Sequence, residues 1–384
     1  MKTSILGRTF CALALAVPGL SADAQSLFQG KPYLQNPQPD AITVMFQTQR
    51  RAHCRVEFGT DTVQLRRART LVAGQELCHD IENAIVLDSL EPGRTYYYRV
   101  CAQEITEYKS YSKKFGEEER TPFFTFKLPR KDESDFTALV LNDLHAYEPT
   151  IQAFAKLAKD IPHDFVVFNG DCFPEPNDRA HAIDMIHALT DRFEAASHPT
   201  LLIRGNHEIR NAYSAGMVSL TQLPGGRTYS AFNWGDTRIV ILDCGEDKPD
   251  DTWVYYGLND FTGLRQEEAN FLQEEVKSKA FRKAAARVAI GHIPLWSSHL
   301  DQYHPCTELW APVMEKADFR VMLNAHTHQH EFLPTGKMGN PFPVAIGGGP
   351  EQETATMMVL RKKGKTMSLQ VLNTEGKEVA TYNL

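Results

Sequence analysis

The sequence predicts two domains, an N-terminal all-β sandwich and a C-terminal layered α/β domain. Short runs rich in β-branched and aromatic residues occupy about residues 30–127, and none of them has helical periodicity. After Asp135, apolar strand-like runs alternate with stretches of helical period, which is typical of a layered α/β domain. A chain of 384 residues with 42% hydrophobic residues is long and apolar enough to form both cores.

The N-terminal region has the pattern of a small antiparallel sandwich. Turn residues such as Pro39-Asp40 and Pro92-Gly93 separate its apolar runs. The charged run 114–120 is interpreted as a solvated loop, and residues 127–135 as a linker. We therefore place the sandwich at 25–130 and the α/β domain at 131–384. The expected strands are at 41–47, 54–59, 84–90, 95–102 and 122–127.

The α/β region alternates strand and helix patterns, and its end contains strands with turns at Gly364 and Gly376. Amphipathic helices are expected around 151–161, 178–196 and 264–276. The expected strands are at 136–142, 165–170, 200–206, 237–243, 287–292 and 320–324.

The first 24 residues resemble a signal peptide in composition. Lys2 and Arg8 form a positive region before a short apolar run that starts at Phe10, and Ala22-Asp23-Ala24 fits a small-residue cleavage site. The run is too short for a membrane-spanning helix, which needs about 20 apolar residues, although a membrane anchor is the alternative. We expect an exported protein, periplasmic or secreted, with no membrane span.

Charge and cysteine content restrict the class of protein further. The formal net charge of -7 argues against a nucleic-acid partner, because such proteins are usually basic. The six cysteines that would remain after cleavage do not make a disulfide scaffold in so long a chain. One disulfide among Cys54, Cys78 and Cys101 and buried free thiols are both compatible with the spacing.

Residues of metal-ligand type follow five of the expected strands. Ligands bind beyond the carboxyl ends of strands in α/β domains, and histidine is the commonest protein metal ligand. Each motif alone has an ordinary explanation, such as a turn, a helix cap or a packed histidine. Their occurrence at five strand ends favours one shared site. The residues are Asp143, His145, Asp171, Asn206, His207, His292, His326 and His328.

The order of these motifs resembles that of the calcineurin-like metallophosphoesterase superfamily. The matching motifs are Asp143-Leu-His145, Gly170-Asp171, Gly205-Asn206-His207-Glu208, Gly291-His292 and Ala325-His326-Thr-His328. The resemblance covers about residues 136–350 and implies two β-sheets flanked by helices. The segments KPYLQNPQPDAITVMFQT and LEPGRTYYYRV also resemble the fibronectin type III-like domain that precedes the catalytic domain in purple acid phosphatases.

Two positions depart from the purple acid phosphatase pattern. This chain has His145 where those enzymes have glycine, and Pro174 where they have the metal-bound tyrosine. The resemblance therefore implies the general metallophosphatase site behind a purple-phosphatase-like β-domain.

The resemblance implies two metal ions that share Asp171. Imidazole, carboxylate and amide donors suit Mn, Fe or Zn better than Ca or Mg. His330 has no role in the pattern. The first metal would be held by Asp143, His145, Asp171 and His328, and the second by Asp171, Asn206, His292 and His326.

By the same resemblance, a metal-bound hydroxide attacks phosphorus while His207 assists the leaving group. Asn206 and His207 are also expected to contact substrate, and Asp171 is counted with the catalytic residues. The alternative role for His207 is a structural pair with Glu208. Arg204 and Arg210 could bind phosphate oxygens, but arginines in such positions are more often ordinary surface residues.

The sequence leaves the substrate open. The expected substrate is a phosphorylated small molecule, with phosphate monoesters first and a phosphodiester or nucleotide as alternatives. A catalytically silent binding protein is the alternative from another class. The aromatic segments 244–260 and 296–310 could form walls of the cleft, and no residue pattern indicates the oligomeric state.

Overall fold

The computed structural model describes residues 26–384, so the expected signal peptide lies outside the described residues. The N-terminal part consists of two antiparallel sheets. One sheet has the order β1 (Phe28–Gln38), β2 (Ala41–Thr48) and β7 (Glu82–Leu87). The other has the order β10 (Phe124–Lys127), β8 (Thr95–Tyr108), β3 (Ala52–Gly59) and β4 (Arg66–Ala68), with β9 (Lys113–Arg120) paired to β8. A short ribbon of β5 (Leu71–Val72) and β6 (Gln75–Glu76) completes this sandwich.

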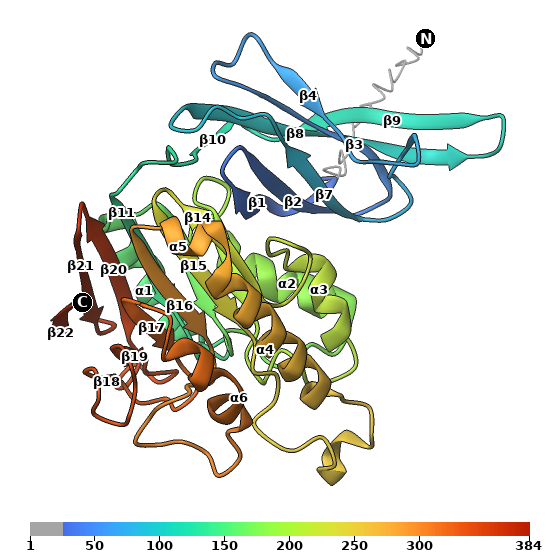
Figure 1. Cartoon of the computed structure of the whole chain (residues 1–384). Helices are drawn as coiled ribbons and strands as arrows, with labels where there is room; N and C mark the ends of the chain where they lie inside the picture. Colours follow the sequence, from blue (N-terminus) through green and yellow to red (C-terminus); the bar gives the residue numbers. More distant parts are fainter. Residues whose placement is uncertain (1–25) are drawn as a thin grey trace, which may run out of the picture.

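The C-terminal part contains two six-stranded sheets (Figure 1). The first has the order β13 (Thr200–Ile203), β12 (Phe165–Asn169), β11 (Phe136–Leu141), β20 (Met357–Lys363), β21 (Thr366–Leu372) and β22 (Glu378–Asn383). The second has the order β14 (Ser230–Trp234), β15 (Thr237–Leu242), β16 (Ala286–Gly291), β17 (Val321–Asn324), β19 (Val344–Ile346) and β18 (Glu331–Leu333). The neighbouring strands β11, β12 and β13 are parallel, as are β15, β16, β17 and β19.

Helices cover the outer faces of both sheets. They are α1 (Glu148–Asp160), α2 (Arg179–Thr190), α3 (Met217–Leu220), α4 (Phe261–Lys277), α5 (Lys279–Lys283) and α6 (Pro305–Met314), with short 3₁₀ turns at Ser214–Gly216 and Trp253–Tyr255. Among residues 26–384, no helix is long and apolar enough to cross a membrane.

Alternation along the buried strands explains the layers. In β11, Ala138 and Val140 belong to the core between the two sheets, whereas Leu139 and Leu141 pack under α1 and α2. In the second sheet, Val240 likewise faces the core that includes α4 and α6. Both faces of each sheet are therefore covered, which requires nearly continuous apolar strands. The predicted fold class, a β-sandwich followed by two sheets flanked by helices, is confirmed.

The β-sandwich packs against one end of the α/β part (Figure 1). The buried Tyr98 hydroxyl donates a hydrogen bond to the Ala196 carbonyl at 2.7 Å, and Tyr33 donates to the Leu220 carbonyl at 3.1 Å. The core between the two sheets of the α/β part continues into the sandwich without interruption. The two parts therefore share one apolar interior.

Two predicted elements are wrong. The charged run expected as a solvated loop is β9, an edge strand paired with β8. Two of its three glutamates are paired, since Glu118 accepts from Arg55 at 2.5 Å and Glu119 accepts from the Leu27 backbone at 2.8 Å. The helix expected to reach 196 ends at Thr190 and continues as turns.

The cysteines form no disulfide within the described residues. Five of them are buried, and Cys78 is half-buried. Of the two alternatives that the spacing left open, the structure therefore has the free thiols.

Candidate metal centre

The eight candidate residues meet where the two sheets present the carboxyl ends of their parallel strands. The first sheet supplies Asp143 and His145 after β11, Asp171 after β12, and Asn206 and His207 after β13; the second supplies His292 after β16 and His326 and His328 after β17. Residues up to 185 positions apart thus come within contact distance because parallel strands end at the same edge.

Backbone hydrogen bonds fix the first two loops against each other. The Asp143 N–H donates to the Gly170 carbonyl at 3.0 Å, and the His145 N–H donates to the Asp171 carbonyl at 2.8 Å. The pairing of β11 with β12 therefore continues beyond the strands, and the two aspartates are held in fixed positions.

Five of the expected ligands have left-handed backbone conformations. Their φ values are 47° for Asp143, 44° for His145, 50° for Asp171, 74° for His326 and 58° for His328. This conformation is uncommon for residues other than glycine, and such residues cluster at functional sites. The backbone is bent at these positions so that the side chains converge.

Asp143 presents one oxygen to the centre. Its Oδ2 accepts hydrogen bonds from the His326 N–H at 2.9 Å and from Nδ2 of Asn142 at 2.7 Å. Its buried Oδ1 has no hydrogen-bond partner in the described part of the chain. That oxygen lies 3.4 Å from Nε2 of His328 and 3.9 Å from Nε2 of His292. A buried carboxylate oxygen needs compensation, which a cation among these atoms would supply.

Asp171 lies between the two groups of histidines. Its Oδ1 accepts a hydrogen bond from the His207 N–H at 2.8 Å. Its Oδ2 is 3.2 Å from Nε2 of His292 and 3.9 Å from Nε2 of His145. Nε2 of His145 is in turn 3.2 Å from Nε2 of His328. A single oxygen of Asp171 therefore faces both sides of the centre.

The Asn206 amide turns its carbonyl oxygen inward. Oδ1 lies 3.0 Å from Nδ1 of His326, and the same position is 3.3 Å from Nε2 of His292 and 3.3 Å from Oδ2 of Asp171. Oδ2 of Asp171 and an unprotonated Nδ1 of His326 are acceptors in this arrangement, so they favour either an inverted amide or a cation that both of them bind. With the amide inverted, its oxygen would instead accept from Nη2 of Arg210 at 3.0 Å. The inward carbonyl is the orientation that a metal ligand requires.

The centre is strongly negative. Burial lowers the pKa of His292, but the carboxylates of Asp171 and Asp143 outweigh burial and raise this pKa to about 10. Burial raises the pKa of Asp171, but the neighbouring His292 outweighs it and holds this pKa well below its ordinary value. The His292 Nδ1–H donates to the Asn169 carbonyl at 2.9 Å, which turns Nε2 toward the carboxylates.

The donors fit two cations. Asp143, His145 and His328 form one group whose ligand atoms lie within 4.8 Å of one another, and Asp171, His292 and His326 form a second. A further group joins His145, Asp171 and His207, so the division of the ligands between two metals stays a prediction. Mixed imidazole and carboxylate donors suit transition metals, so the chemistry of the site matches divalent metal ions.

His207 lies beside the centre and contacts one residue that the sequence did not single out, Glu175. Its Nδ1 is 3.0 Å from Oε1 of Glu175, and its Nε2 is 3.2 Å from Nη1 of Arg210 and 4.0 Å from Oδ2 of Asp171. The alternative pairing with Glu208 does not occur. Glu175 follows Asp171 in the same loop, and only its closeness to a strand-end motif could have indicated it.

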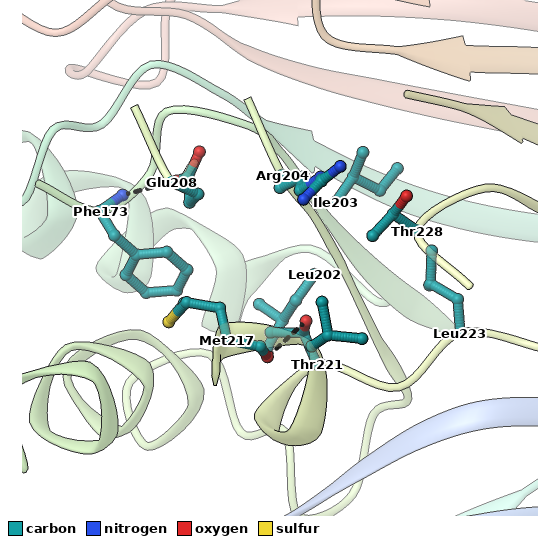
Figure 2. A pocket seen from close by; sticks show the side chains of 10 residues that line it. Phe173, Leu202, Ile203, Arg204, Glu208, Met217, Thr221, Leu223 and Thr228 are labelled. Carbon is teal, nitrogen blue, oxygen red and sulfur yellow. Dashed lines mark hydrogen bonds between the residues drawn. The ribbon is translucent and has the colours of Figure 1, made fainter. Parts of the chain in front are cut away.

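Glu208 instead binds the backbone of two ligand-bearing loops. Its carboxylate accepts from the N–H groups of Asp171 at 2.8 Å, Phe173 at 3.0 Å and Gly205 at 2.7 Å. Burial and the charge of Asp171 raise the pKa of Glu208 to about 7. Figure 2 shows Glu208 and Phe173 at the edge of a largely apolar pocket. None of the expected metal ligands is among the residues that line this pocket. Glu208 therefore fixes the loops rather than meeting substrate.

The remaining sequence candidates lie outside the centre. Arg204 is paired with Asp243 at 2.5 Å, and Arg210 makes a bidentate ion pair with Glu246 at 2.8 and 3.0 Å. His330 is bonded to the Ile346 carbonyl and the Tyr382 hydroxyl. Neither arginine is thus free to bind phosphate without giving up an acidic partner.

Comparisons with known proteins agree with the fold described above. The solved structure of purple acid phosphatase PPD1 from yellow lupin (Lupinus luteus) seeds is similar over 92% of this chain and 73% of that chain, with a TM-score of 0.67 and 14% identity. A structure of PhoD is similar over 92% of this chain and 88% of that chain, with a TM-score of 0.63 and 13% identity. At these identities the likeness shows the fold. None of the curated proteins compared with the chain matches it.

The family is shown by the sequence of the α/β part. Residues 136–330, just over half of the chain, match the model of the calcineurin-like phosphoesterase family. The matched range includes every residue of the metal centre described above. The chain therefore belongs to the calcineurin-like phosphoesterase family and is a metal-dependent phosphoesterase.

Proposed function

We propose that this protein is an exported phosphatase that uses two metal ions to hydrolyse phosphate monoesters. The observation that carries the proposal is the position of Asp171 Oδ2, which faces His145 on one side and His292 on the other. A shared carboxylate of this kind is what a two-metal site needs. Two bound Mn, Fe or Zn ions would clamp the phosphoryl oxygens and lower the pKa of bound water.

His207 is the proposed proton donor to the leaving oxygen. Glu175 lies 3.0 Å from its Nδ1 and can stabilise the protonated imidazole ring. With Nδ1–H directed at Glu175, Nε2 is the nitrogen left to carry the transferable proton toward substrate. A guanidinium can only donate, so Nη1 of Arg210 donates to Nε2 at 3.2 Å in the structure, and Nε2 carries a proton only when this bond is given up. Asn206 would help to orient the substrate beside the second group of ligands.

The preference for monoesters and the export of the protein are also proposals. Trp253 and Tyr256 are strongly exposed in the segment 244–260, and their contact with a leaving group is part of the proposal. Gln25 is the proposed mature N-terminus. Hydrolysis of matched aryl monoester and diester substrates, together with N-terminal sequencing of the protein from the native host's cell envelope or medium, tests both points.

The central experiment compares metal content and aryl phosphate hydrolysis in four proteins. We expect wild type to hold about two metal ions and to be active. His207→Ala should keep its metal and lose roughly 10²–10⁴-fold in kcat, the usual contribution of a general acid. Asp171→Asn should lose metal as well as activity, whereas His79→Ala, a change of an exposed histidine in the sandwich, should alter neither.

The outcomes separate the alternatives. A wild-type protein that holds two metals but cleaves neither monoesters nor diesters would support a silent binding protein. Preferential cleavage of diesters or nucleotides would replace the monoesterase proposal with the corresponding activity on the same centre. A wild-type protein that takes up no Mn, Fe or Zn would contradict the ligand assignment.

A further inference from the structure

The two ring nitrogens of His326 have different partners. Nδ1 faces the inward carbonyl oxygen of Asn206 at 3.0 Å, on the side of the metal centre. Nε2 faces Oδ2 of Asp301 at 2.7 Å, on the outer side. A neutral imidazole carries one proton, and a carboxylate can only accept it. Asp301 therefore favours the tautomer with the proton on Nε2, which leaves the Nδ1 lone pair directed at the centre.

The segment that carries Asp301 is fixed at its start. Glu331 in β18 accepts hydrogen bonds from the hydroxyls of Ser297 at 2.8 Å and Ser298 at 2.5 Å. The Ser298 N–H donates to the same carboxylate at 3.1 Å. The chain thus leaves the β16 loop in a defined direction.

The segment is also fixed at its end. The buried Arg265 of α4 donates from Nη1 to the Tyr303 hydroxyl at 2.9 Å. Through Nε and Nη2 it donates to the carbonyls of Cys244 at 2.9 Å and Glu246 at 2.6 Å. One buried guanidinium therefore links the segment of Asp301 to the opposite segment 244–260, so Asp301 is held against His326 by fixed neighbours.

A second arrangement of the same residues has to be distinguished. Ligand atoms of Asp247, Asp301 and His326 lie within 4.8 Å of one another, so Asp301 could itself bind a cation. Lys248 already pairs with Asp247, however, and Asp301 contacts the imidazole directly. These contacts favour an orienting role for Asp301.

We propose that Asp301 is a positioning residue that sets the tautomer of His326 and thereby the affinity of the second metal position. The proposal rests on the two-metal function proposed above. Partners that orient a ligating histidine typically change metal affinity by about 10–100-fold when they are removed. Nothing in the motif spacing indicates this residue, which lies 25 positions before His326.

The test is a titration of Mn²⁺ into metal-stripped full-length protein, followed by calorimetry and by metal analysis after gel filtration. Asp301→Ala should weaken one of two binding events by about 10–100-fold. Asp301→Asn should lose less, because its amide oxygen can still accept from Nε2–H. Asp251→Ala, which removes an exposed aspartate from the opposite segment, should bind as wild type does. The melting temperature of the metal-free variants should stay within a few degrees of wild type.

Three results would overturn the proposal. If Asp301→Ala binds two ions with wild-type affinity, Asp301 has no positioning role, while the two-metal function stands. If wild type binds three Mn²⁺ ions per chain and Asp301→Ala binds only two, Asp301 is a ligand of a separate third cation. If wild type itself binds no Mn²⁺, Fe or Zn, the proposed function fails and this proposal fails with it.

Discussion

At the scale of single residues, His292 illustrates how the centre is prepared for a cation. Its Nδ1 is committed to the Asn169 carbonyl, and its Nε2 lies between two carboxylates. In the metal-free protein those carboxylates raise its pKa from 6.5 to about 10, so a proton occupies the place of a metal. A metal ion must displace that proton, since only neutral imidazole can be a ligand.

Metal binding should therefore release a proton, and affinity should increase with pH. Below about pH 10 the metal competes with the proton on His292, so this residue alone should raise the apparent affinity by about tenfold per pH unit, and the raised pKa of His328 should add to the slope where that residue is protonated. His145 should add nothing above pH 6.5, because burial lowers its pKa and leaves it neutral there. Calorimetry at pH 8 in buffers of different ionisation enthalpy measures the released proton, and an enthalpy that is independent of the buffer would contradict the prediction.

The residues of the centre were predictable to the extent that they belong to local motifs. Asp143, Asp171 and His292 each follow an apolar strand, so their identity and their shared edge could be inferred from the sequence. Glu175 and Asp301 could not be inferred, because each is defined by a contact with a residue in another loop. Local patterns specify the ligands, whereas the partners that orient them depend on the packing of loops.

At the scale of elements, the loops after β12 and β13 form one unit. The Glu208 carboxylate accepts hydrogen bonds from backbone N–H groups of both loops, and the backbone of Gly205 passes close to Asp171. A Cβ atom at Gly205 would lie 2.7 Å from the Asp171 backbone nitrogen and closer still to its Oδ1. The absence of a side chain at this glycine is therefore required for the carboxylate of Asp171 to keep its place.

Gly205→Ala should displace Asp171 and disrupt metal binding. Relief of the overlap should cost about 1–3 kcal/mol of stability, as overpacking of a core usually does. Gly116→Ala in β9 is a matched control, since its Cβ would be no closer than 3.6 Å to any neighbour. Urea unfolding and metal content measure the two effects, and a Gly205→Ala protein with two metals and wild-type stability would contradict this account.

The elements themselves were predicted well where burial sets the pattern. The strands β11, β12 and β16 are almost continuously apolar because both of their faces are covered, and the sequence shows this directly. The edge strand β9 was missed because its charges pair with Arg55 and with backbone groups rather than facing only water. Charge at a sheet edge is also a common protection against aggregation, and charge alone does not distinguish it from a loop.

At the scale of the whole molecule, the sandwich and the α/β part should unfold together. Their apolar interiors are continuous, and buried tyrosine hydroxyls of the sandwich donate to backbone carbonyls of the α/β part. The sandwich therefore acts as a support for the loops beyond α2. The sequence suggested that the sandwich packs beside the other domain but did not specify these contacts, because one acceptor, Ala196, lies in a turn and the other, Leu220, ends the short helix α3.

Tyr98→Phe should lower the stability of the whole protein by about 1–2 kcal/mol, since it leaves the Ala196 carbonyl without its partner. The half-buried Tyr97, which points to the other face of β8, provides the control Tyr97→Phe. Urea unfolding followed by fluorescence and by circular dichroism should give one shared transition. Two transitions, with only one of them shifted by Tyr98→Phe, would show that the parts unfold independently.

The left-handed backbone at five ligand positions has a consequence for how such a protein evolves. Aspartate and histidine have a higher conformational energy than glycine or asparagine at these φ values, so each of the five residues lowers the stability of the metal-free chain. In a lineage that no longer needed the metals, replacing these residues would raise stability, and selection would no longer remove the replacements. The presence of all five in this chain is what continued selection for metal binding would leave behind, and it favours an active enzyme over a silent descendant.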